Sequence, residues 1–187
     1  KLDAAFAMLE KAEKTQGGVQ CDRYSYHAFS TGLSMFYPMW AREGKTEDFI
    51  NRLKDPANDA RIRAYVKERE EMLGSWDNVL ISSVFTDKNK HMEGKTILVA
   101  AKEAGKPCYE FSRDLIIEEE NRVSMIGFAM SEDNLKRVLA HPLVVVGSDG
   151  NSIAPYGPLG EGVPHPRSYG TFPRVLGKFV REEKIMP

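Results

Sequence analysis

The apolar run Val144-Val145-Val146, followed at once by Gly147-Ser148-Asp149-Gly150, constrains the fold of this chain more than any other feature. Three β-branched residues that stop at a glycine-containing turn predict a buried strand that ends in one carboxylate. In α/β proteins the loops after the C-terminal ends of the strands converge on one face, where chemistry tends to sit. Ser-Asp-Gly is also a common turn, so the pattern alone leaves a purely structural role open.

The rest of the chain alternates between predicted strands and predicted helices. We expect strands over 19–22, 79–85, 123–130 and 143–146, and helices over 2–14, 46–53, 59–73, 94–104, 107–120, about 131–141 and from Val175 onward. Segment 23–40, rich in aromatics, predicts a packed loop or an irregular helix. This alternation favours an α/β fold with parallel strands. The gap between the first and last strands far exceeds one crossover helix, so we expect a mainly helical insertion at about 29–121.

Composition narrows the class of protein. A net charge of −1 gives no electrostatic reason for nucleic acid or an anionic membrane as a partner. No apolar run approaches the roughly 18 residues that cross a bilayer, and the two cysteines fit reduced thiols, so we expect a cytoplasmic protein with Cys21 in its core and Cys108 facing a helix interior. The chain opens with Lys1 and both ends fall in predicted helices, so we expect it to be part of something larger.

Three further residues could form a site with Asp149. Arg167 is expected to be a loop residue at the end of the Gly/Pro-rich stretch that follows Asp149, and a guanidinium can hold a carboxylate through two parallel hydrogen bonds. Tyr24 and Ser30 follow the first strand, so in a barrel they would share the face of Asp149. A buried tyrosine hydroxyl seeks a hydrogen-bond partner, and a substrate carbonyl is one such partner. Packing of Tyr24 in an aromatic core is the alternative.

Other catalytic patterns are absent or incomplete. Glu93-Gly94-Lys95-Thr96 looks like the tail of a phosphate-binding loop, but Asn89 stands where that loop needs glycine. The four histidines have no metal-ligand spacing, and no serine has the G-x-S-x-G pattern. These observations argue against nucleotide binding and against a serine hydrolase.

A series of motifs, taken in order, resembles the N-acyl-D-amino-acid deacylases, or D-aminoacylases, of the amidohydrolase superfamily. The motifs are Asp22-Arg23-Tyr24-Ser25-Tyr26 with Ser30-Thr31, Glu93-Gly94-Lys95-Thr96, Gly127-Phe128-Ala129-Met130-Ser131-Glu132, Gly147-Ser148-Asp149-Gly150, and the run from Pro164 to Gly177. The last run is the longest and the most specific. Two departures stand out: Ser25 replaces the usual proline, and the loop between Asp149 and Arg167 is longer than usual.

The resemblance implies a fold, a partial (β/α)8 barrel. Members of the family have a complete (β/α)8 barrel beside a small β-sandwich, with a helical insertion between the last two barrel strands. Residues 1–28 would hold a barrel helix and strand seven, 29–121 the helical insertion, and 122–187 strand eight, the active-site loop and the start of the last helix. The chain would then be the C-terminal third of such an enzyme, because the family's metal-binding His and Cys residues lie on earlier strands.

The resemblance also implies an activity, the zinc-dependent hydrolysis of the amide bond in N-acyl-D-amino acids. Asp149 would touch the zinc and act as general base, and Arg167 would pair with the substrate α-carboxylate. Tyr24 and Ser30 would contact substrate. Most zinc ligands would lie upstream, so the chain by itself is expected to be inactive, since a catalytic zinc needs about three protein ligands.

Two alternatives remain open. Another amidohydrolase, such as a dihydroorotase-like cyclic amidase, would use Asp149 but would not need Arg167 as a carboxylate clamp. A non-catalytic domain would use the insertion as a lid or an interaction surface. A half-open barrel exposes apolar strand edges, so self-association of the chain is expected in that case.

Overall fold

The computed structural model describes residues 1–186, which divide into two compact units that each combine helices and strands. Unit 1 is assembled from three separate stretches, Lys1–His27, Met130–Pro155 and the residues from Pro166 onward. Unit 2 consists of Ala28–Ala129 and Tyr156–His165. The fold class is therefore mixed α/β, as predicted. None of the helices in residues 1–186 is long and apolar enough to cross a membrane.

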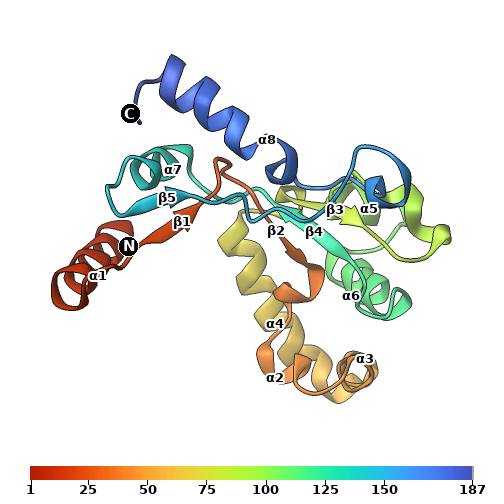
Figure 1. The fold of residues 1–187 in the computed structure, drawn as a ribbon. Coiled ribbons are helices and arrows are strands. Elements are labelled where there is room, and N and C mark those ends of the chain that lie inside the picture. Colours follow the sequence, from red (N-terminus) through yellow and green to blue (C-terminus); the bar gives the residue numbers. More distant parts are fainter. Residues whose placement is uncertain (187) are drawn as a thin grey trace. The chain divides into compact units, whose positions relative to one another are not determined.

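Unit 1 is built on a two-stranded parallel sheet (Figure 1). Its elements are α1 (Leu2–Gln16), β1 (Cys21–Arg23), α7 (Glu132–Leu139), β5 (Val144–Val146), α8 (Arg167–Arg174) and a π-helix (Val175–Glu182). In the register of the sheet, Cys21 faces Val144, Asp22 faces Val145 and Arg23 faces Val146. Two segments more than a hundred residues apart in sequence thus end at the same edge, since parallel strands share their direction.

A small apolar core holds unit 1 together. Leu135 and Leu139 of α7 pack against Val175 and Phe179, and all four are buried. The hydroxyl of Ser131 accepts a hydrogen bond from the backbone N–H of Asn134 (3.3 Å), which satisfies a free donor at the start of α7. This core positions α7 and the π-helix next to β5.

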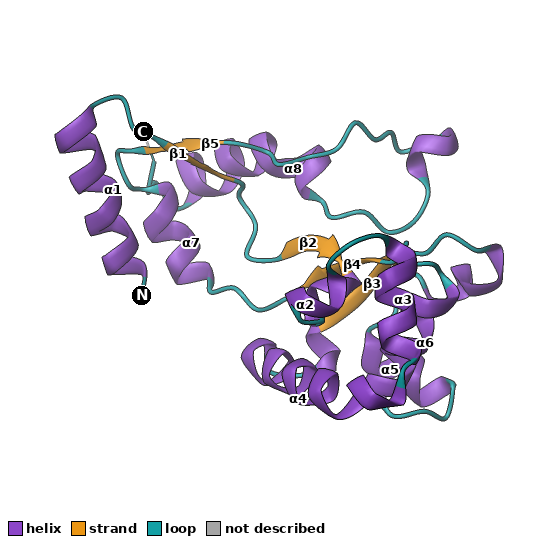
Figure 2. Ribbon diagram, turned by 90° about the horizontal axis from the view of Figure 1, so that it is seen from below, coloured by secondary structure: helices purple, strands orange, loops and turns teal. Residues whose placement is uncertain are grey.

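Unit 2 contains a three-stranded antiparallel sheet in the order β2-β4-β3. Its elements are β2 (Phe29–Gly32), α2 (Met39–Arg42), α3 (Thr46–Lys54), α4 (Pro56–Leu73), β3 (Val79–Ser83), α5 (Ile97–Glu103), α6 (Cys108–Glu118) and β4 (Ser124–Gly127). In Figure 2, α4, α5 and α6 gather on one side of this sheet. The larger of the two cores lies here, formed by residues such as Phe36, Phe49, Ile62, Ile81, Ile116 and Met125.

Three predictions about local structure were wrong. The strands of unit 2 are antiparallel, although strand–helix alternation predicted parallel pairing. Segment 23–40, expected to be a packed loop or an irregular helix, contains strand β2. This strand pairs with β4, which is far along the chain, so no local sequence pattern predicts it. Cys21 is exposed rather than buried, because it lies in β1, a strand with only one neighbour. Cys108 is half-buried and packs against the core of unit 2.

Glu119 is a fully buried carboxylate in unit 2 that organises the segment after β3. It accepts hydrogen bonds from the backbone N–H groups of Phe85 (2.6 Å) and Thr86 (2.8 Å), from the Thr86 hydroxyl and from Nδ2 of Asn89 (2.6 Å). Burial alone would raise the pKa of this carboxyl. The donors outweigh burial, so its pKa lies below the usual range.

Replacing Glu119 by Gln should destabilise the protein by about 1–3 kcal/mol. The NH₂ group of the new amide is itself a donor, and it would face buried N–H and O–H groups that now donate to the carboxylate. The lowered pKa gives the pH dependence its sign. The ionised Glu119 stabilises the fold above the pKa of the unfolded chain, and this contribution is lost as the pH falls through the folded pKa. Urea unfolding at pH 7 and pH 3 measures the loss of stability and its pH dependence. The control is Glu120→Gln, because Glu120 forms only an exposed ion pair with Arg122. Equal stability of the two variants at pH 7 would contradict the assignment.

Candidate active site

The candidate site lies in unit 1, where β1 and β5 end. The backbone N–H of Gly147 donates to the carbonyl of Arg23 (3.2 Å), which extends the parallel ladder one residue past β5. A Cβ at Gly147 would lie 2.4 Å from Oδ2 of Asp22, so a larger residue there would displace the Asp22 side chain. The chain then turns into the loop that carries Asp149.

Asp149 has a left-handed backbone conformation, with φ 48°. Aspartate tolerates this region better than most residues because its short side chain can bond locally. The loop is fastened to the first turn of α8. The Ser168 hydroxyl accepts from the backbone N–H of Asn151 (3.1 Å), and a Cβ at Gly150 would lie 2.8 Å from Cα of Ser168. The position of the carboxylate is thus defined by α8 as well as by β5.

Arg167 is the first residue of α8 and joins Asp149 in an ion pair, with 2.8 Å between Nη1 and Oδ2. Its side chain is only 11% exposed, whereas that of Asp149 is 60% exposed. The guanidinium carbon of Arg167 lies 5.1 Å from the ring centroid of Tyr24, and that of Arg23 lies 4.1 Å from the same ring. Tyr24 itself is buried. Three of the predicted site residues therefore lie together.

The sequence placed Arg167 in a loop, and this was wrong. The helix begins at Arg167, eight residues earlier than the expected start at Val175. Proline at the N-terminal edge of a helix has a suitable φ and no N–H to leave unpaired, so Pro166 favours a helix start. Arg167 is consequently carried by a regular element, which fixes its direction better than a loop would.

The fourth predicted residue, Ser30, belongs to unit 2. It lies in β2, opposite Ile126 of β4, and its role in substrate contact stays a prediction. His165 is buried in the same unit, where its Nε2 lies 3.0 Å from the carbonyl oxygen of Ala28. Within residues 1–186, no group of three His, Cys, Asp or Glu side chains could hold a metal ion.

Sequence reasoning missed a layer of residues behind the site. Ser25 is fully buried and its hydroxyl donates to the backbone carbonyl of Thr171 in α8 (3.1 Å). Nε of Arg174 donates to the backbone carbonyl of Ser25 (2.9 Å). One signal was available: Arg174 lies seven residues after Arg167, a spacing that puts both on the same face of a helix.

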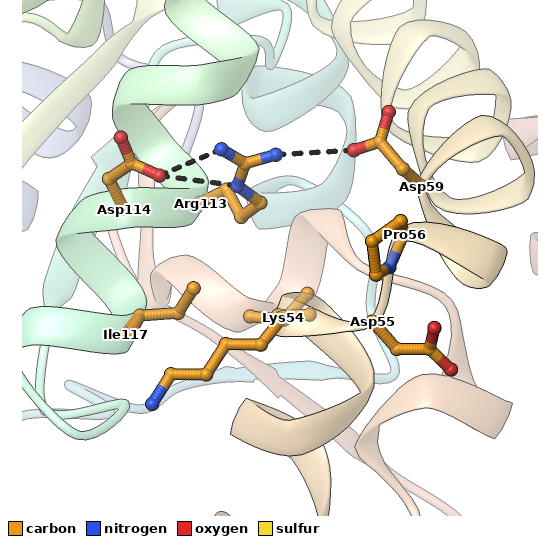
Figure 3. Close-up of a pocket in the computed structure, with 8 residues that line it drawn as sticks. Lys54, Asp55, Pro56, Asp59, Arg113, Asp114 and Ile117 are labelled. Carbon is orange, nitrogen blue, oxygen red and sulfur yellow. Dashed lines mark hydrogen bonds and ion pairs between the residues drawn. The ribbon is translucent and has the colours of Figure 1, made fainter.

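A cavity of about 530 Å³ lies elsewhere, in unit 2, between α3, α4 and α6 (Figure 3). Arg113 spans it, 3.3 Å from a carboxylate oxygen of Asp59 and 2.9 Å from one of Asp114. Burial would raise the pKa of both carboxyls, but their charged and hydrogen-bonding partners lower the pKa of each below its usual range. These charges pair with one another, which is a structural use of the side chains. None of the four predicted site residues lines this cavity.

No family model matches the chain, but curated proteins and solved structures do. Curated relatives from Alcaligenes xylosoxydans xylosoxydans include a D-aminoacylase, 34% identical over 96 residues, which are 51% of this chain and 17% of the relative. They also include an N-acyl-D-glutamate deacylase, 41% identical over 61 residues, which are 33% of this chain and 11% of the relative.

Solved structures match nearly the whole chain. An N-acyl-D-glutamate deacylase from Bordetella bronchiseptica, complexed with zinc and a phosphonate inhibitor that mimics the tetrahedral intermediate, matches 98% of this chain and 28% of its own, with a TM-score of 0.66 and 27% identity. A D-aminoacylase with a binuclear metal centre matches 100% of this chain and 29% of its own, with a TM-score of 0.63 and 27% identity. The predicted resemblance to N-acyl-D-amino-acid deacylases is confirmed, and this chain spans less than a third of each of these relatives.

Gly150→Ala should test the attachment of the Asp149 loop to α8. The new methyl group would meet the Ser168 backbone, so the loop must shift, and we expect a loss of stability of about 1–3 kcal/mol. Gly177→Ala is the matched control, because a Cβ there has no neighbour within 4 Å. Thermal unfolding followed by circular dichroism measures both variants. A Gly150→Ala protein as stable as the control would show that the loop is not packed as described.

Proposed function

We propose that this chain is part of a zinc-dependent hydrolase that deacylates N-acyl-D-amino acids by attack of an activated water on the amide. The observation that carries the proposal is the pairing of Asp149 with Arg167 beside Tyr24, at the end of two parallel strands. These are the residues, and the kind of place, that the deacylase resemblance implies. The sequence and structural likeness to deacylases supports the same reaction class.

We further propose that β1 and β5 are the last two strands of a (β/α)8 barrel. Their parallel pairing supports this, because adjacent barrel strands run parallel. The proposed insertion, residues 29–121, includes most of unit 2, which has its own sheet and its own core. A segment with a separate core can be inserted into a barrel without disturbing the strands on either side.

Asp149 is proposed as a zinc-contacting residue and as the general base. Its carboxylate is largely exposed at the strand end, and carboxylate oxygens are among the donors that zinc accepts, so the residue fits this metal. When bound, zinc would supply Lewis-acid activation of water. Asp149 would accept a proton from the attacking water and pass it to the nitrogen of the departing amine.

Arg167 is proposed to bind the α-carboxylate of the substrate. A guanidinium has its N–H donors in a planar fork that matches a carboxylate, and Arg167 already pairs with one carboxylate, that of Asp149. Tyr24 packs against this guanidinium and limits its movement. Ser30 is retained as a proposed substrate contact. A cyclic amidase would not need such a clamp, which makes it the less favoured function.

Replacing Arg167 by Ala should separate the two functions. In the full-length protein that contains this chain, we expect KM for N-acetyl-D-methionine to rise about 30- to 150-fold, which corresponds to about 2–3 kcal/mol for a lost charged hydrogen bond. The rate for a cyclic amide without a free carboxylate should change little. A wild-type enzyme that prefers the cyclic amide, or that hydrolyses the L-enantiomer equally well, would contradict the proposal.

Replacing Asp149 by Asn should lower kcat about 10²- to 10⁴-fold, because the amide cannot accept the proton. Asp133→Asn, an exposed acid in the first turn of α7, is the matched control and should keep normal activity. Steady-state kinetics with N-acetyl-D-methionine measures both variants, and zinc content by atomic absorption checks the proposed metal contact. Normal kcat in the Asp149→Asn enzyme would exclude Asp149 as the general base.

A further inference from the structure

The segment that follows β1, which includes Ser25 and Tyr26, packs against α8. These contacts are separate from the ion pair between Asp149 and Arg167. Ser25, with no exposed surface, donates from its hydroxyl to the carbonyl of Thr171. Arg174 donates from Nε to the carbonyl of Ser25. One buried residue thus both donates to α8 and accepts from it, which fixes the distance and the rotation of the helix relative to the segment.

Packing around Tyr26 strengthens this attachment. The guanidinium carbon of Arg174 lies 5.1 Å from the Tyr26 ring centroid, a distance typical of a cation–π contact. At Gly170 an added Cβ would lie 2.2 Å from the Tyr26 hydroxyl oxygen, so the Tyr26 hydroxyl lies close to the helix at this position. The segment therefore meets α8 at positions 170, 171 and 174, which lie on one face of the helix.

The same helical turn carries the candidate site. Thr171 lies one turn after Arg167, and its hydroxyl donates to the carbonyl of Arg167 (2.8 Å). On the other side, Ser25 directly follows Tyr24, whose ring packs against the Arg167 guanidinium. A shift of α8 along this segment would therefore move Arg167 away from Tyr24 and Asp149 together.

We propose that Ser25 and Arg174 are positioning residues that hold α8 where Arg167 can bind the substrate carboxylate. The inference rests on the proposed function for its catalytic consequence, but its structural part stands on the contacts alone. Neither residue is assigned a contact with substrate. Their loss should weaken carboxylate recognition more than turnover, because Arg167 is proposed to bind the substrate carboxylate and takes no part in the proposed proton transfer.

The first experiment measures how well Arg167 is held in this chain. The Arg167 side chain is 11% exposed, so its modification by phenylglyoxal, followed by peptide mass spectrometry, should be slow. Ser25→Ala and Arg174→Met should each speed it about fivefold or more, the change expected for the loss of one hydrogen bond. Arg181→Met, which removes an exposed guanidinium from the π-helix, is the matched control.

Ser25→Thr keeps the hydroxyl and should restore slow modification if the residue fits. Arg174→Lys, which keeps the charge and lacks Nε, serves if Arg174→Met fails to fold by circular dichroism. Unchanged reactivity of Arg167 in both Ser25→Ala and the folded Arg174 variant would overturn the inference, whatever the protein's activity proves to be.

The second experiment measures specificity in the full-length protein. The ratio of kcat/KM for N-acetyl-D-methionine to that for its carboxamide should fall about tenfold in the Arg174 variant, with kcat changed little. Equal losses on both substrates would indicate a general structural defect and overturn the positioning role. If the wild-type protein hydrolyses neither substrate, the proposed function fails, and the reactivity of Arg167 still decides whether Ser25 and Arg174 position it.

Discussion

Parallel pairing of β1 with β5 determines where everything else in unit 1 can lie. Because the strands run in the same direction, the segments that leave them, one with Tyr24 and one with Asp149, start from the same edge. The ladder is only three residues long, and close approach at Gly147 extends it by one bond. Helix α8 then fastens both segments, because it contacts Ser25 on one and Gly150 on the other.

The two side chains of the ion pair between Asp149 and Arg167 differ in their exposure to solvent. The Arg167 guanidinium, with an 11% exposed side chain, has lost most of its contact with water, whereas the Asp149 side chain, 60% exposed, keeps much of its hydration. Under the proposed function, a substrate carboxylate would approach this largely buried guanidinium, where a charged hydrogen bond is stronger than in water. Under the same proposal, the exposed carboxylate of Asp149 is the group that would contact the metal ion and accept the proton.

The sequence predicted which residues of the candidate site lie together better than it predicted the structure around them. Asp149 could be predicted because a β-branched run ends at it, and Arg167 and Tyr24 because they stand in motifs that follow strand ends. The start of α8 at Arg167 could not be predicted, because Pro164 and Pro166 are as typical of loops as of a helix start. Strand β2 could not either, because four residues with partners in β4 leave no local signature. Whether Ser30 belongs to the site stays a prediction.

The sizes of the two cores explain why polar contacts matter at the site. Unit 2 has an extensive apolar core, whereas the buried core of unit 1 is Leu135, Leu139, Val175 and Phe179, and these lie on α7 and the π-helix. Only Thr171 of α8 is buried. Apolar packing is roughly proportional to buried area and has no direction, so it can hold α8 near β1 without fixing its rotation. Directional hydrogen bonds from Ser25 and Arg174 supply that constraint.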